Sequence, residues 1–379
     1  MEDKGYIRSL DGVRAIAIIL VMTFHSGITR FGWIGVQLFF VLSGFLITGI
    51  LWKEKSKTGT LPFKFKKFWV RRSLRIFPLY YAYLAVIGIV YLAVHFPSYF
   101  TLFIPYAVTY TANFPLQLLH TVGNPLFNHL WSLSIEEQFY LLFPLIILLS
   151  SRKLIKVLLV SILFLSPILR LLMGEYYRSK GFPAAIVADG VNFNTLCQLD
   201  AFCFGGIIPV FALDGKIGRP WRLLGIMACL ALGAGLASYL ASPAGEPYLL
   251  DLGYYHYYID QYQHVWQYTL LNLVFACTIL ALISAVGKHR FPLLRKALEN
   301  KWMVNVGKVS YGMYIYHWLI WVYLFVAVFH PQTVAFKLLL FIPYVVIVYA
   351  FSELSYRIYE RRFIQLKDKF FPGKPTPAG

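Results

Sequence analysis

The sequence predicts an all-α, polytopic membrane helix bundle. Of its 379 residues, 59% are hydrophobic and only 14% are charged, which is more apolar surface than a soluble domain of this size buries. The apolar residues are grouped in runs of about 17–25 residues, the length that crosses a bilayer as a helix. The basic residues collect in alternate connections between these runs. Together these observations predict about ten transmembrane helices.

The distribution of basic residues predicts the orientation of the spans. With both termini in the cytoplasm, the inner side holds all but five of the 35 Lys and Arg residues. This asymmetry follows the positive-inside rule. Topology, followed by attraction to membrane lipids, therefore explains the net charge of +18, and no nucleic-acid partner is expected. The five exceptions are Arg30, Arg170, Arg178, Lys180 and Lys337. The expected spans are residues 10–27, 34–52, 76–94, 133–150, 157–173, 194–213, 221–241, 265–286, 309–329 and 334–356.

Two connections and the C-terminal stretch lie outside these spans. Residues 53–75 are a predicted cytoplasmic connection with nine basic residues and one acidic residue. The outer segment 95–132 has no Lys or Arg, and its apolar part is broken by Pro105 and Pro115. We expect that part to be interfacial or re-entrant. Residues 1–356 are predicted to form one transmembrane domain and residues 357–379 a basic cytoplasmic tail.

The first span carries a basic residue near each end. In a helix, Arg14 and His25 lie about 16 Å apart and within about 20° of the same face. Asp11, three residues before Arg14, is placed to pair with it. Ionisable groups inside membrane helices are costly and usually functional. Snorkelling to the cytoplasmic surface is the alternative for Arg14, but it does not explain His25, which is predicted near the outer side.

An arginine cluster opens the third span. Arg71 and Arg72 precede Arg75 by four and three residues, so a helix gathers their side chains. Guanidinium groups stay charged and bind phosphate oxygens in pairs, which suits a polyphosphate ligand. Positive-inside anchoring is the alternative.

The fourth span begins with two adjacent glutamates. Glu136 shares a helix face with Ser132 and Tyr140 and is predicted at about the depth of His25. A carboxylate that orients a histidine and stabilises its charged form is typical of general base catalysis. Solvated glutamates at the membrane interface are the alternative.

Other polar residues fall within later spans or in the outer loop. Asp200 and His317, the latter sharing a face with Tyr314, fit helix–helix hydrogen bonds and a substrate cavity equally well. The Tyr-rich outer loop 242–264 fits an interfacial aromatic belt better than a sugar site. The four cysteines lie in apolar spans without metal-ligand spacing, so no metal site is expected.

Together these segments resemble the acyltransferase 3 family of membrane acyltransferases. The resemblance covers nearly the whole chain and is carried in order by SLDGVRAIAIILVMTFH, GVQLFFVLSGFL, RRSLRIFPLYY, HLWSLSIEEQFYLLFP, LDAFCFGG and VGKVSYGMYIYHW. It implies a ten-helix protein of the bacterial inner membrane. Such a protein moves an acyl group, commonly acetyl, from cytoplasmic acyl-CoA to a hydroxyl, often of a glycan or glycolipid outside the membrane. Members with a soluble esterase-like domain are longer, so the chain resembles the stand-alone type.

Carried onto this sequence, the resemblance implies His25 as the catalytic histidine and Arg14 as its motif partner. Arg72 and Arg75 are implied donor-site residues, and Glu136 is the motif carboxylate. The expected enzyme is an O-acyltransferase with acyl-CoA as co-substrate and no permanently bound cofactor. Arg14, Arg71, Arg72 and Arg75 are expected to bind the donor, His25 and Glu136 to act in catalysis, and Asp11, Ser132, Asp200, Tyr314 and His317 to line the acceptor site or cavity.

Three alternatives stay open at this point. Direct transfer and a relay through acyl-His25 use the same residues. A proton-coupled transporter also explains intramembrane ionisable residues. The third alternative is an acyltransferase that carries out the same acyl transfer but uses a small molecule or a lipid headgroup as the acceptor.

Overall fold

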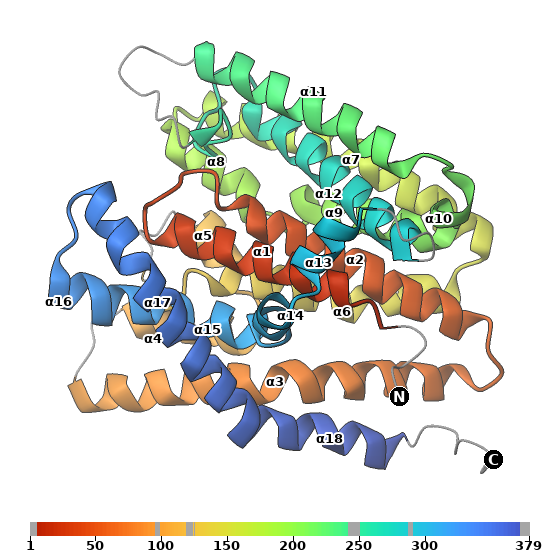
Figure 1. Cartoon of the computed structure of the whole chain (residues 1–379), viewed down its shortest axis with the longest axis horizontal. Helices are drawn as coiled ribbons and strands as arrows, with labels where there is room; N and C mark the ends of the chain where they lie inside the picture. Colours follow the sequence, from red (N-terminus) through yellow and green to blue (C-terminus); the bar gives the residue numbers. More distant parts are fainter. Residues whose placement is uncertain are drawn as a thin grey trace.

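The computed structural model is all-α over the residues it describes, which are 6–94, 99–118, 124, 126–241, 251–286 and 291–371. In Figure 1, α11 lies at the top and α3 and α18 lie at the bottom, with α1 and α2 between them. The helices are α1 Arg8–His25, α2 Ile34–Lys55, α3 Leu61–Val94, α4 Tyr99–Val108, α5 Asn113–Leu118, α6 Leu130–Leu149, α7 Arg152–Ser179, α8 Ala184–Asn192, α9 Thr195–Phe211, α10 Leu213–Lys216, α11 Pro220–Leu240, α12 Gln263–Val286, α13 Pro292–Leu298, α14 Lys301–Lys308, α15 Ser310–Ile320, η2 Trp321–Val326, α16 Ala327–Phe329, α17 Val334–Ser355, η3 Tyr356–Glu360 and α18 Arg361–Phe370.

Eight helical segments in the described part of the chain are long and apolar enough to cross a membrane. Helices α8 and α9, bent by 50° at their junction, make a ninth if they are counted as one broken span. The all-helical membrane bundle is therefore confirmed, whereas the count of ten is not. The remaining expected span corresponds to α1, whose charged residues Arg8, Asp11 and Arg14 lower its hydropathy although most of its residues are buried.

Two helices extend beyond the predicted spans. Helix α3 begins at Leu61, so much of the predicted connection 53–75 is helical. Pro62 lies in its first turn, where the missing backbone N–H costs nothing. At the other end of the chain, η3 and α18 continue the helix to Phe370, past the predicted boundary at residue 356. The stretch broken by prolines forms the short helices α4 and α5, and neither qualifies as a span, as predicted.

Helices α2 and α9 approach closely because glycines form the contact. A Cβ atom added to Gly44 would lie 2.0 Å from the carbonyl oxygen of Phe202, and one added to Gly205 would lie 2.0 Å from that of Val41. Small residues allow membrane helices to pack backbone against backbone. The contact brings α9 against the helix that carries Ser43.

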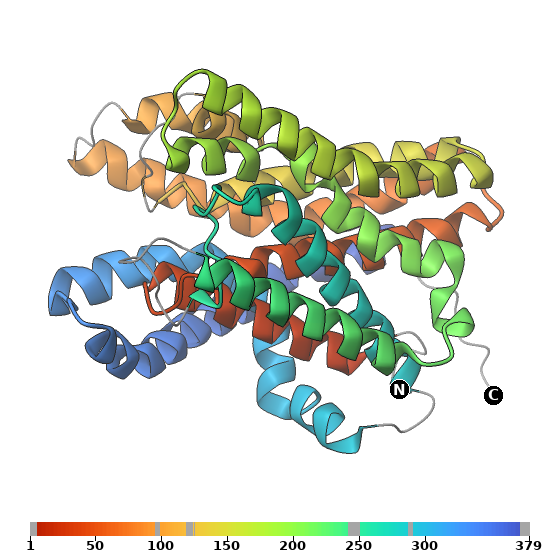
Figure 2. The same cartoon turned by 90° about the horizontal axis from the view of Figure 1, so that it is seen from above.

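The flanking helices present apolar side chains outward. Helix α11 packs on α12 and lies on the near side of the molecule in Figure 2. Its Leu230, Leu232 and Leu236 are more than half exposed. An apolar face of this kind is stable in hydrocarbon and not in water. The exposed face and the apolar spans together indicate an integral membrane protein.

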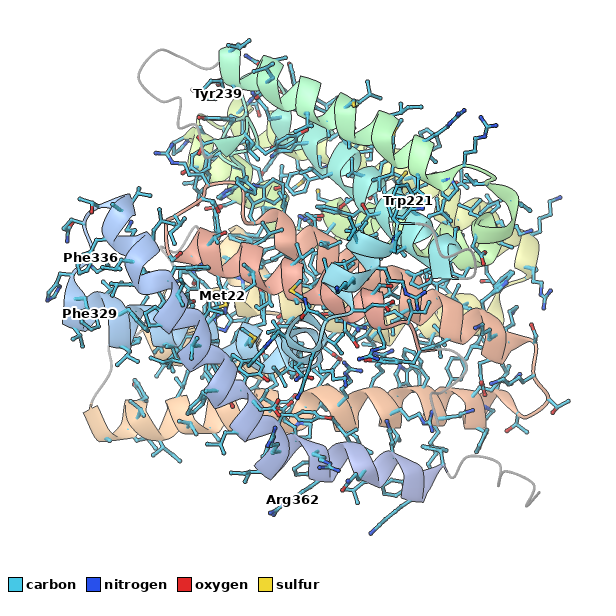
Figure 3. All side chains as sticks on the ribbon, in the orientation of Figure 1. Met22, Trp221, Tyr239, Phe329, Phe336 and Arg362 are labelled. Atoms are coloured by element: carbon cyan, nitrogen blue, oxygen red, sulfur yellow. The ribbon has the colours of Figure 1, made fainter. Side chains whose placement is uncertain are left out.

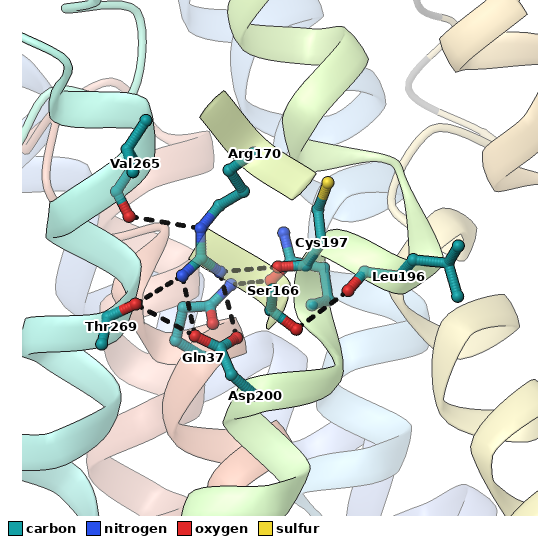
Figure 4. Close-up of polar contacts among 9 residues, drawn as sticks. Gln37, Ser166, Arg170, Leu196, Cys197, Asp200, Val265 and Thr269 are labelled. Carbon is teal, nitrogen blue, oxygen red and sulfur yellow. Dashed lines mark hydrogen bonds and ion pairs between the residues drawn. The ribbon is translucent and has the colours of Figure 1, made fainter. Parts of the chain in front are cut away.

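A buried ion pair joins three helices (Figure 4). Arg170 of α7 forms two hydrogen bonds to Asp200 of α9, from Nη2 to Oδ2 at 2.8 Å and from Nη1 to Oδ1 at 3.0 Å. The guanidinium also donates to the carbonyl oxygens of Cys197 at 2.6 Å and of Val265, in α12, at 3.2 Å. Both side chains are fully buried. Of the two roles expected for Asp200, the structure shows the contact between helices.

Breaking this ion pair is expected to destabilise the bundle. In Arg170→Leu, the Asp200 carboxylate stays buried without its partner, which costs about 3–5 kcal/mol. The double variant Arg170→Leu/Asp200→Leu removes both charges and should regain much of that loss. Thermal unfolding of the purified proteins in detergent measures whether wild type, the double variant and the single variant follow this order of stability. A single variant as stable as wild type would contradict the assignment.

Candidate functional site

A cavity of about 260 Å³ lies between α1, α2, α3, α6 and α15. Its wall has a basic part, two glutamates, and aromatic, aliphatic and hydroxyl side chains. Its lining residues are Arg14, Val36, Phe39, Phe40, Ser43, Leu46, Ile47, Ile50, Arg72, Arg75, Ile76, Ser132, Leu133, Glu136, Glu137, Tyr140, Ser310, Tyr311 and Tyr314.

Three arginines from two helices line the cavity. Arg14 is held by an ion pair with Asp11, as predicted, and Asp11 also accepts a hydrogen bond from the Tyr6 hydroxyl. Asp11 is thus a partner of Arg14 and is not part of the cavity wall. The Arg72 guanidinium lies 5.4 Å from the ring centroid of Tyr140, and Arg75 follows one turn later on α3.

Arg71 does not join this group. Its Nη2 donates to the carbonyl oxygen of Phe371, after α18, at 3.5 Å. Successive residues of a helix are rotated by about 100°, so Arg71 and Arg72 face different neighbours. The predicted cluster therefore divides into two cavity arginines on α3 and one that contacts the C-terminal segment.

Glu136 lies on the cavity wall in a small hydroxyl network. Its Oε1 accepts hydrogen bonds from the Ser43 and Tyr140 hydroxyls, whose oxygens lie 3.1 Å apart. The shared face of Ser132, Glu136 and Tyr140 is confirmed, since all three line the cavity. The described hydrogen bonds of Glu136 go to Ser43 and Tyr140, and the orientation of His25 by Glu136 stays a prediction.

The partners of His25 are other aromatic rings. Its half-buried ring lies 5.0 Å from the ring of His317 and 4.2 Å from that of Trp318, centroid to centroid. The ring of His129, just before α6, lies 5.6 Å from that of His317. His129 precedes Glu136 by seven residues, about 10 Å along a helix. The predicted face of the fourth span therefore meets His317 through His129, and Glu136 lies further along α6.

His317 is held in one tautomer. Its Nδ1 lies 2.7 Å from the carbonyl oxygen of Tyr314. Because a carbonyl oxygen only accepts, Nδ1 carries the proton and Nε2 of the neutral ring carries a lone pair. Nε2 is buried without a hydrogen-bond partner in the described part of the chain. A lone pair next to His25 suits a site that moves a proton.

Ser132 and Tyr314 connect the cavity to the histidines. The Tyr314 hydroxyl is hydrogen-bonded to Ser132 Oγ and donates to the carbonyl oxygen of His129 at 3.0 Å. The Tyr314 ring lies 5.4 Å from that of His317. The cavity thus runs from the arginines to a tyrosine that contacts the histidine cluster, defined as His25, His129 and His317.

His129 is the residue that the sequence interpretation missed. It lies outside the expected span 133–150, where ionisable residues attract notice. Its spacing could have identified it as a site residue. His129 precedes Ser132 by three residues, and Ser132 precedes Glu136 by four, so a helix places all three on one face.

Part of the Tyr-rich loop lies beside the end of α1. Trp33 Nε1 donates to the carbonyl oxygen of Tyr254 at 2.7 Å, and the ring of His256 lies 5.4 Å from that of Phe24. Burial lowers the pKa of His256 to about 3, so the ring is neutral at neutral pH. Residues 242–250 of the predicted loop lie outside the described residues.

The fold and the site define a membrane-embedded helix bundle with a cavity that arginines line and whose Tyr314 contacts the histidine cluster. The chain belongs to the acyltransferase 3 family, whose model, described as an acyltransferase domain, matches residues 7–355. This confirms the resemblance that the sequence motifs carry.

Relatives in this family include two named O-acetyltransferases. The chain is 28% identical over 399 residues to the O-acetyltransferase OatA of Staphylococcus aureus, which covers 100% of this chain and 60% of that protein. It is 28% identical over 335 residues to the peptidoglycan O-acetyltransferase OatA of Listeria monocytogenes, which covers 83% of this chain and 49% of that protein. The chain therefore spans about half to three-fifths of the length of these relatives. No solved structure matches it.

Proposed function

We propose that this protein transfers an acyl group, in the simplest case acetyl, from acyl-CoA to a hydroxyl of a cell-envelope glycan. The observation that carries the proposal is the cavity that is lined by three arginines and by Tyr314, whose ring lies 5.4 Å from that of His317 in the histidine cluster. The names of the OatA relatives, one of them a peptidoglycan O-acetyltransferase, favour acetyl as the acyl group and a glycan as the acceptor.

The arginines fit the donor. Coenzyme A carries three phosphates at one end of a long, flexible pantetheine arm and the acyl thioester at the other. Arg14, Arg72 and Arg75 line one part of the cavity and offer guanidinium donors for phosphate oxygens. The arm would extend through the apolar part of the cavity toward Ser132 and Tyr314. In this proposal acyl-CoA is a co-substrate, and no permanently bound cofactor takes part.

The histidines fit the transfer step. The acceptor hydroxyl attacks the thioester carbonyl carbon, His25 accepts the hydroxyl proton, and the C–S bond breaks to release the CoA thiolate, which takes up that proton. General base assistance of this type contributes about 10²–10⁴-fold. In the alternative relay, His25 itself carries the acyl group between donor and acceptor. Glu136 acts in this proposal on the cavity wall, where it fixes Ser43 and Tyr140 beside Arg72.

The proposal includes an arrangement across a bacterial inner membrane. In it, α1 and the bent pair α8–α9 cross the bilayer with the other spans, which makes ten, and both termini are cytoplasmic. Arg14 then lies toward the cytoplasmic donor, and His25, about 16 Å further along α1, lies toward the outer acceptor.

Mass spectrometry of envelope glycans tests this function. Cells that carry the wild-type protein should contain a glycan heavier by one acyl group than the same glycan from cells that carry His25→Ala at equal abundance. Identical glycans in both strains, together with wild-type-dependent accumulation of a labelled solute, would contradict acyl transfer and indicate a transporter.

A further inference from the structure

A lysine lies beside the turn that follows His25. A Cβ atom built on Gly27, two residues after His25, would lie 2.9 Å from Lys337 Nζ. Gly27 has φ +68°, a conformation that favours glycine and leaves room for the ammonium group. Phe336, the residue before Lys337, lies in Figure 3 at the end of the bundle where α1 ends and α17 begins.

Lys337 differs from the other cations predicted on the outer side. The described residues provide no carboxylate within 4 Å of its Nζ and no hydrogen-bond acceptor. The other four all have partners in the structure: Arg30 pairs with Asp251 at 3.7 Å, Arg170 with Asp200 at 2.8 Å, Arg178 with Glu175 at 3.1 Å, and Lys180 lies 5.9 Å from the ring centroid of Tyr176.

The stability of α17 does not explain this lysine. Lys337 is the fourth residue of the helix, and the N-terminal turn carries the positive end of the helix dipole. A cation is favoured at the opposite end, and an anion is favoured at this one. The ammonium group therefore adds to a local positive potential that is suited to an anionic ligand.

A half-buried aromatic ring lies next to the His25 ring. Trp318 is 4.2 Å from the His25 ring between centroids, with an angle of 37° between the planes. The indole ring offers a large apolar face on which the C–H groups of a sugar ring pack. His25 therefore has Trp318 beside its ring and Lys337 beside the turn that follows it.

We infer that Lys337 and Trp318 form an acceptor subsite beside His25 that selects glycans carrying a carboxylate or phosphate group. Trp318 packs against the sugar, and Lys337 binds the anionic group and so presents a neighbouring hydroxyl to His25. This inference rests on the proposed function, because it concerns the acceptor of the same transfer reaction.

Steady-state kinetics with matched acceptors test the subsite. The full-length protein in nanodiscs is given acetyl-CoA and one of two acceptor pairs: a glycan with a free carboxylate and its methyl ester, or a phosphorylated glycan and its dephosphorylated form. The variants are Lys337→Gln, Lys337→Arg, Trp318→Ala and the control Lys180→Gln.

A charge-specific change in KM is the expected result. Lys337→Gln should raise the KM for an anionic acceptor about tenfold, since a charge-assisted hydrogen bond is lost. Its kcat and its KM for the uncharged acceptor should stay unchanged. Lys337→Arg should retain most of the affinity, and Lys180→Gln should match wild type. Trp318→Ala should raise KM for both members of an acceptor pair. The acceptor pair in which Lys337→Gln raises KM only for the charged member shows whether the anionic group is a carboxylate or a phosphate.

Two outcomes would overturn the inference. An unchanged KM in Lys337→Gln would show that the lysine contacts lipid headgroups only, and an equal rise for charged and uncharged acceptors would show a structural role. In both cases wild-type transfer to a glycan persists, so the proposed function stands. No transfer by wild type to any glycan would instead overturn the proposed function and the subsite together.

Discussion

Replacing His25 with alanine is expected to lower kcat for acyl transfer by about 10²–10⁴-fold while the bundle stays folded. His25 is half-buried beside His317 and Trp318, and it makes no hydrogen bond or ion pair with the described residues that holds the fold together. His25→Gln should show a similar loss, because an amide fills the space but does not accept a proton at neutral pH. Transfer of labelled acetyl from acetyl-CoA to a glycan gives the rate, and thermal unfolding confirms the fold.

The control for this prediction is His330→Ala. His330 is an exposed histidine at the end of α16, outside the histidine cluster. Its removal should leave the rate unchanged. Wild-type kcat in His25→Gln would contradict the role of His25 as proton acceptor and acyl carrier alike.

Replacing Arg72 with glutamine is expected to raise the KM for acyl-CoA by about 10- to 100-fold. The substitution removes charge-assisted hydrogen bonds to a phosphate, which contribute about 1.5–3 kcal/mol. The effect on kcat should be smaller, because Arg72 is proposed to bind the donor far from the bond that breaks. Initial rates over a range of acetyl-CoA concentrations separate the two constants.

Arg71→Gln is the matched control. It removes the same charge from the same helix turn, but Arg71 contacts the carbonyl oxygen of Phe371 and does not line the cavity. Its KM for acyl-CoA should stay within about twofold of wild type, since the Arg71 guanidinium donates to the C-terminal segment and offers no hydrogen bond to a phosphate in the cavity. Equal effects of the two substitutions would indicate general attraction by a basic surface and contradict a phosphate site in the cavity.

Relationships within one helix were predictable from the sequence. The pairing of Asp11 with Arg14 and the shared face of Ser132, Glu136 and Tyr140 depend only on helical periodicity, and the structure has both. Pro105 and Pro115 likewise predicted a segment too short to span, although each proline lies inside a short helix. Local geometry of this kind needs no knowledge of neighbouring helices.

Relationships between helices were not predictable in the same way. The depth of Glu136 relative to His25 depends on how far α6 is shifted along α1, and hydropathy does not encode that shift. The pairing of Arg170 with Asp200 depends on which helices become neighbours. Hydropathy also does not reveal that the charged residues of α1 are accommodated inside the bundle, where Arg14 pairs with Asp11.

The most direct measurement of the central claim uses sealed proteoliposomes that contain the full-length protein. Labelled acetyl-CoA is enclosed in the lumen, and the glycan acceptor is supplied only outside. If the arginine end of the cavity binds the donor and the histidine end serves the acceptor across the membrane, label should appear on the external glycan with wild type and not with His25→Ala. Labelling that occurs only when donor and acceptor share one side of the membrane would contradict the account.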